Sequence, residues 1–147
     1  MTSYLPQIIH DINTVAGITG FFITVLVMLQ VRSIRQTFLA RARLPQINKD
    51  LRKAGSELNK HLTNWPNHKT NGHQQIKIAA SLIDGALPLI PRSARRESKA
   101  IKKKLAQASR DFHSLTYDYP NIVWDLYSDI QVVIVNLDQI EKNLKWE

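Results

Sequence analysis

The longest apolar stretch of the chain lies near its beginning. From Ile12 to Val31, 20 consecutive residues carry no charge, and Asp11 and Arg32 bound the stretch. A helix of this length is about 30 Å long, which matches the hydrocarbon core of a bilayer. Eleven of these residues are Leu, Ile, Phe or Val, and each of them favours membrane insertion by roughly 0.3 to 0.6 kcal/mol. The pattern therefore predicts a transmembrane helix over residues 12–31.

The flanking charges separate this prediction from its alternatives. The first ten residues contain no Lys or Arg, whereas Arg32, Arg35, Arg41 and Arg43 follow the stretch, which is the reverse of the order in a cleaved signal peptide. The stretch also lacks the polar face of an interfacial helix, so a buried helix of a soluble core is the remaining alternative. Because flanking cations are retained in the cytoplasm, we expect an extracytoplasmic N-terminus over 1–11, a cytoplasmic domain over 32–147, and anchoring in the cell (inner) membrane.

One face of the predicted span is lined by small residues. Ala16, Gly20 and Thr24 recur at every fourth position, and small residues let helix backbones approach closely in lipid. The pattern indicates a transmembrane packing face, although glycine and threonine are common in membrane helices in any case.

After the span, helical spacing of apolar residues alternates with helix breakers. The pattern predicts the following order: a continuation over 32–44, an interruption or restart at Pro45, an amphipathic helix over 47–63, a polar loop over 64–72, and helices over 73–87, over 93–117 and from Pro120 onward.

The last predicted helix has the most regular pattern. Its apolar residues step alternately by three and four, which forms a helix-packing seam: Val123, Leu126, Ile130, Val133, Leu137, Ile140 and Leu144. Further apolar residues widen this stripe beyond a two-stranded coiled coil, so we expect burial inside a bundle with one side left for a partner. The predicted fold is all-α, with one N-terminal transmembrane helix followed by a cytoplasmic antiparallel bundle of about four helices.

Charged residues are strongly segregated along the chain. The chain has a net charge of +8; residues 32–110 hold 18 Lys and Arg against four acids, and residues 111–147 hold two Lys against seven acids. We therefore expect the acidic last helix to pair with its basic neighbours, in contacts that stabilise by less than about 1 kcal/mol each.

Six cations follow helical order on one predicted face, opposite Ile101 and Leu105: Arg92, Arg95, Arg96, Lys99, Lys102 and Lys103. We call this set the basic face. A solvated helix surface is its simplest interpretation. The functional alternatives are anionic lipid, which we favour because the chain is tethered at a membrane, an acidic protein partner, or nucleic acid, which is less favoured because no aromatic residue interrupts the set.

The residues of common catalytic sites are not arranged for chemistry here. The chain has no cysteine, and its five glycines form no phosphate-binding loop. His61, His68 and His73 lack metal-ligand spacing and are interpreted as part of a polar loop. Asp125 and Asp129 share a helix face that must be polar in any case. We therefore predict no enzyme, no catalytic residues, no bound metal and no cofactor.

These patterns lead to one expected function and two alternatives. We expect a single-pass membrane-anchored interaction module that is a homo-oligomer or a small subunit of a hetero-complex. The first alternative is a membrane-disrupting effector, such as a toxin or an antiviral defence component, that oligomerises through its transmembrane helix. The second is membrane-tethered binding of nucleic acid or a nucleotide through the basic face.

Overall fold

The computed structural model describes residues 5–112 and 120–146, and the side chains of residues 17–112 and 120–145. It contains four helices and, within these residues, no strand. The helices are α1 (Leu5–Leu62), α2 (Trp65–Ala86), α3 (Arg92–Arg110) and α4 (Pro120–Trp146). The expectation of an all-helical chain is confirmed.

The chain divides into two compact units, residues 1–36 and residues 37–147. In the first unit, every side chain from Gly17 to Gln36 is exposed, including large apolar ones. One helix near the N-terminus is long and apolar enough, by length and composition, to cross a membrane. The second unit is a helical bundle with a single core.

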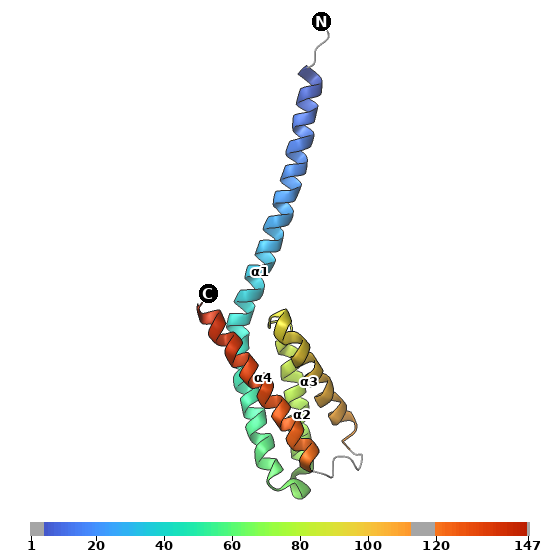
Figure 1. Ribbon diagram of the computed structural model, residues 1–147, viewed down its shortest axis with the longest axis vertical. Helices are drawn as coiled ribbons and strands as arrows, with labels where there is room; N and C mark the ends of the chain where they lie inside the picture. The colour runs from blue at the N-terminus through green and yellow to red at the C-terminus, as the bar shows by residue number, and fades with distance from the viewer. Residues whose placement is uncertain (1–4, 113–119, 147) are drawn as a thin grey trace. The chain divides into compact units, whose positions relative to one another are not determined.

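The core of the bundle receives side chains from all four helices. Leu51 of α1, Ile83 of α2, Leu105 of α3 and Ile130 of α4 are fully buried in one apolar cluster. Figure 1 shows that the part of α1 inside the bundle, α2, α3 and α4 run in alternating directions. Apolar residues at three- and four-residue steps place one side of each helix in this core.

Helix α1 passes through Pro45 without a break, so the expected interruption there is wrong. A proline inside a helix removes one backbone hydrogen bond and costs about 3 kcal/mol or more. The residues around it compensate, because Leu44, Asn48 and Leu51 are buried against the rest of the bundle, while Pro45 itself is exposed. Tertiary packing therefore outweighs the local helix-breaking preference.

The predicted polar loop over 64–72 is also wrong, because α2 begins at Trp65 and contains most of that segment. Trp65 is only 2% exposed, and its ring lies 6.0 Å from that of Phe112. Pro66 occupies the first turn of the helix, where a missing N–H is tolerated, and a kink with non-helical dihedral angles follows at His68. One buried tryptophan thus anchors a helical segment in which all other residues except Pro66 and Gly72 are polar.

Helix α3 differs from its predicted range mainly at its end. It begins at Arg92, one residue before the expected Ser93, and its last residue is Arg110. The backbone N–H of Asp111 closes the helix by donating to the carbonyl of Gln107 at 3.0 Å. The predicted end at Tyr117 lies outside the described residues.

Gly72→Ala is expected to destabilise the bundle by about 1–3 kcal/mol, because the new methyl group overpacks the core. A Cβ at this position would lie 2.3 Å from Cζ3 of the buried Trp65 ring. The measurement is chemical unfolding of the full chain in detergent. The matched control is Gly85→Ala in the same helix, where a Cβ would meet nothing within 4 Å; equal destabilisation by both changes would contradict the packing described here.

Candidate functional site

The basic face lies on the outer side of α3. The opposite side of this helix is buried through Ser98, Ile101, Leu105 and Ala108. Four cations of the basic face are exposed, namely Arg92, Arg96, Lys99 and Lys103. Within the described residues none of these four forms an ion pair, so their charge is available to a ligand.

The other two cations of the basic face are engaged within the bundle. Arg95 donates from Nη2 to the carbonyl of Ile90 at 3.0 Å, while its Nε is buried without a hydrogen-bond partner. Nζ of Lys102 lies 3.0 Å from a carboxylate oxygen of Asp84 on α2. Arg95 therefore secures the turn between α2 and α3, and Lys102 links the two helices.

An open groove of about 620 Å³ lies along α3 beside the end of α2. Lys99, Lys102, Lys103 and Arg110 contribute its positive charge, and Asp84 and Asp111 contribute two negative charges. Arg110 was missed by the sequence reasoning. Its spacing of seven residues from Lys103, which is itself seven residues after Arg96, is the signal that could have found it.

Carboxylates of α4 pair with cations of neighbouring helices, which confirms the pairing expected from the charge segregation. Asp129 lies 2.6 Å from Nζ of Lys104 on α3. Asp138 pairs with Arg52 on α1 and accepts a 2.6 Å hydrogen bond from Nδ2 of the buried Asn48. These contacts reduce the net negative charge that α4 presents to solvent.

The pKa of Asp138 lies below its ordinary value of 3.8. Burial of the carboxyl by itself raises this pKa, but hydrogen bonds from Arg52 and Asn48 and the positive charge of Arg52 outweigh that effect. A carboxyl whose pKa is depressed by folding stabilises the protein above its unfolded-state pKa, and loses this contribution as the pH falls through the folded-state pKa.

Asp138→Asn is therefore expected to lower the unfolding free energy near pH 7 by under about 1 kcal/mol, as for a partly exposed pair. The difference from wild type should shrink as the pH falls below the ordinary pKa of 3.8. Chemical unfolding of the wild type and the variant, as full chains in detergent near pH 7 and below pH 3.8, measures this difference. The exposed Asp125→Asn serves as the control, and a deficit that persists at acidic pH would contradict the ionic origin.

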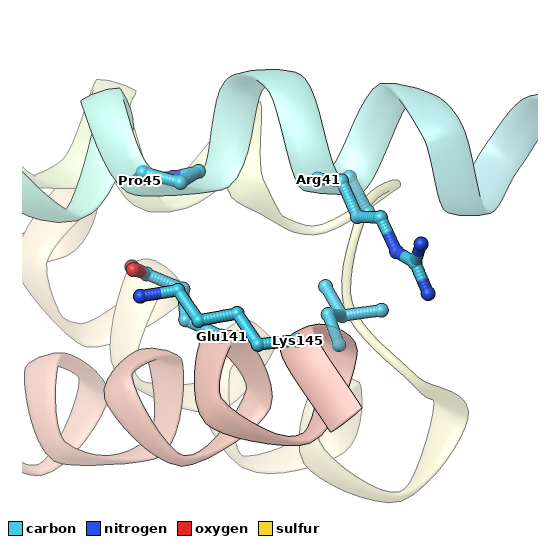
Figure 2. A pocket seen from close by; sticks show the side chains of 6 residues that line it. Arg41, Pro45, Glu141 and Lys145 are labelled. Carbon is cyan, nitrogen blue, oxygen red and sulfur yellow. The ribbon is translucent and has the colours of Figure 1, made fainter. Parts of the chain in front are cut away.

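A smaller pocket of about 210 Å³ lies between α1 and the end of α4. Figure 2 shows Arg41 and Pro45 on α1 facing Glu141 and Lys145 on α4. Ala40 and Leu144 complete its lining. The pocket brings cations from two distant parts of the chain together at one end of the bundle.

Of the predicted transmembrane packing face, the structure describes the side chains from Gly20 onward, and that of Ala16 lies outside the described residues. Thr24 Oγ1 donates to the carbonyl of Gly20 at 2.8 Å, so its hydroxyl is satisfied within its own helix. A Cβ on Gly20 would meet nothing within 4 Å. The backbone at Gly20 is therefore open to close approach by another helix.

The seam of α4 lies inside the bundle's own core. Its first six residues are buried, and Leu144 packs against the core while partly exposed. The side of α4 that faces solvent carries Trp124, Val132 and Val135, which are exposed apolar residues. Any contact of α4 with another protein must therefore use this outer side.

The three histidines singled out in the sequence lie in helices rather than in a loop. Nδ1 of His61 and Nδ1 of His68 are 3.3 Å apart, which is a hydrogen-bond contact. Nε2 of His73 lies 2.8 Å from the carbonyl of Ser109, and its ring stacks on Phe112 with centroids 4.0 Å apart. Among the described residues, no group of three or more His, Asp or Glu side chains is placed to hold a metal ion.

No family model, curated protein or solved structure matches this chain. What the bundle and its cations do is therefore inferred from the residues themselves.

Proposed function

We propose that this chain is a single-pass membrane-anchored interaction module, which works as a homo-oligomer or as a small subunit of a membrane complex. The observation that carries the proposal is the exposed apolar surface of α1. Ten large apolar residues between Ile18 and Val31 have exposed fractions of 38% to 71%. Leaving such a surface in water is unfavourable by roughly 25 cal/mol for each Å² of apolar area.

The distribution of these side chains favours lipid over a soluble partner. Successive residues of a helix are rotated by about 100°, so apolar residues at nearly every position cover its whole circumference. The segment from Phe21 to Leu29 is of this kind, interrupted only by Thr24. A soluble partner would need to cover one stripe, whereas a bilayer surrounds the helix on all sides.

The proposed orientation places the N-terminus outside and the bundle in the cytoplasm. The cations Arg32, Arg35, Arg41 and Arg43 follow the apolar segment within about three helical turns and are exposed. Charges of this kind near the end of a span are retained on the cytoplasmic side.

The proposed role of the bundle is binding. The four unpaired cations of the basic face and the adjoining groove support this role, because exposed charges of one sign attract an oppositely charged surface and orient it. An acidic protein partner or anionic lipid has the required charge.

The experiment that tests the proposal is purification of the full-length protein from its native cells in mild detergent, with mass measurement of the intact complex. A hetero-complex of defined stoichiometry supports a subunit role. A homo-oligomer that is lost in Gly20→Leu, but kept in the control Val25→Leu on another face of the helix, supports self-association through the span. A monomer under all detergent conditions would contradict both forms of the proposal.

Overexpression separates this proposal from the effector alternative. An interaction module is expected to leave membrane potential and growth unchanged, whereas an oligomeric effector would collapse the potential. Collapse by wild type and its absence in Gly20→Leu would replace the proposed function by the effector function.

A further inference from the structure

We infer that the end of the bundle at which α1 enters is a docking surface for anionic lipid headgroups, which we call the entry-end surface. It consists of six exposed cations from three helices: Arg41 and Arg43 of α1, Arg92 and Arg96 of α3, and Lys142 and Lys145 of α4. The inference rests on the proposed membrane anchoring of α1. It adds the bundle itself as a second, electrostatic contact with the same membrane.

The pocket between α1 and α4 places two parts of this surface together. Arg41 and Lys145 line the same pocket, although they are distant in sequence (Figure 2). Nδ2 of Asn48 donates to Glu141 at 2.7 Å and to Asp138 at 2.6 Å. These contacts hold the last turns of α4 beside the part of α1 that opens the bundle.

Two contacts between α3 and α4 place the third part. Asn136 donates to Glu97 at 2.9 Å, and Lys104 pairs with Asp129 at 2.6 Å. The two helices are therefore antiparallel. The beginning of α3, which carries Arg92, lies level with the last turns of α4. Figure 1 accordingly shows the turn between α2 and α3 at the same end of the bundle as the end of α4.

Positive charge at this end is not balanced by the described carboxylates around it. Glu141 is half-buried and accepts its hydrogen bond from Asn48. Glu97, next to Arg96 in α3, accepts a hydrogen bond from Asn136, so these two carboxylates stand against six cations. Asp138 is paired with Arg52, and Asp84 with Lys102. In the part of the chain that the structure describes, none of the six cations of the entry-end surface forms an ion pair.

The chain itself keeps this surface close to the bilayer. Eight residues lie between Arg32, at the end of the apolar segment, and Arg41, the first cation of this surface. Even a fully extended chain of this length reaches only about 30 Å. Attraction of Lys and Arg to an anionic surface decays over a Debye length of about 8 Å at physiological salt. The short connection keeps the bundle near enough to the bilayer for its cations to come within this distance of the headgroups.

This assignment differs from one that uses the whole basic face. Helix α3 extends about 27 Å from Arg92 to Arg110, so its later cations lie well away from the entry end. Lipid docking through the entry-end surface uses Arg92 and Arg96 and leaves Lys99, Lys103 and Arg110 to the groove. The two surfaces can therefore be separated by mutation.

The test uses the full chain in nanodiscs and exploits the absence of native cysteine. A fluorescent donor is attached at Ser93→Cys, at the entry end, or at Thr70→Cys, an exposed position near the opposite end. Energy transfer to an acceptor on the lipid headgroups is compared between phosphatidylcholine alone and phosphatidylcholine mixed with phosphatidylglycerol. We expect transfer from the Ser93 position to rise in the anionic nanodiscs and to fall again when salt is added, with no change at Thr70.

Matched triple variants identify the residues responsible. Arg41→Glu with Arg92→Glu and Lys145→Glu should abolish the rise. Lys53→Glu with Lys77→Glu and Arg110→Glu, which makes the same change in net charge on exposed residues away from the entry end, should retain it. Circular dichroism checks that both variants keep their helices.

The wild-type comparison decides the inference without any variant. Equal transfer from Ser93→Cys in the two lipid mixtures would overturn it, as would loss of the rise in the control triple but not in the entry-end triple. A chain that does not remain in nanodiscs at all would count against the proposed membrane anchoring instead, so the two failures are distinguishable.

Discussion

Replacing Phe22 and Leu26 together by arginine is expected to remove the chain from the membrane fraction. Each arginine at the centre of a span costs about 2.5 to 3.5 kcal/mol on insertion scales. The two therefore cost about 5 to 7 kcal/mol, which equals or exceeds the roughly 3 to 7 kcal/mol supplied by the 11 large apolar residues of the segment. Both side chains are exposed in the structure, so the change removes no packing of the bundle core.

Resistance to extraction by alkaline carbonate measures this effect. The control exchanges the two residues, Phe22→Leu with Leu26→Phe, and should remain in the membrane pellet. If the double arginine variant resists extraction as strongly as the wild type does, retention in the membrane does not depend on this segment. That result would contradict the proposed transmembrane helix.

Ile130→Ala is expected to destabilise the bundle by about 2 to 5 kcal/mol. Ile130 is fully buried in the core, and its Cγ2 would lie 3.6 Å from a Cβ on Gly55 of α1. Truncation leaves a cavity that closely packed neighbours fill only in part. Because native domains are stable by only about 5 to 15 kcal/mol, the loss is a large fraction of the total.

Unfolding by denaturant, followed by circular dichroism on the full chain in detergent, measures the change. The control is Val135→Ala on the same helix, where the side chain is 61% exposed, and its effect should stay within about 0.5 kcal/mol. Similar losses in both variants would mean that α4 presents a different side to the core.

The bundle could be predicted from the sequence where apolar spacing is regular and long. In α4 the steps of three and four from Val123 to Ile140 identify its buried side, and all of these seam residues lie in the core. In α3, Ile101 and Leu105 are buried, and four of the six cations of the basic face are exposed. Periodicity over several turns averages out individual residues, which is why these assignments succeed.

Sequence reasoning failed where the contacts of a single residue determine the local structure. Pro45 and the polar segment after Trp65 both indicate an end of helix locally, and packing by distant residues reverses each indication. Gly72 has its role only because the Trp65 ring lies against it. None of these contacts produces a repeating pattern of apolar residues that could be recognised in the sequence.

The candidate surfaces were predictable only in part. The basic face is local to one helix, so helical spacing was sufficient to find it. The engagement of Arg95 and Lys102 depends on the α2–α3 turn and on Asp84. The entry-end surface combines cations from three segments, and their proximity follows from the directions of the helices rather than from any local pattern.

Asn48 and Gly55 also favour one register of α1 against α4 over registers shifted along the helix axis. Leu44, Leu51 and Leu58 are all fully buried and repeat at intervals of seven residues, so a shift of α1 by one heptad would leave leucines in equivalent places. Such a shift would bring Asn48 or Leu62 to the place of Gly55, where even a Cβ comes within 3.2 Å of Gln131 Nε2. It would also withdraw the Asn48 amide from Asp138 and Glu141. Polar and size mismatches of this kind penalise misaligned helix pairs more than they strengthen the correct one, and here they keep Arg41 beside Lys145.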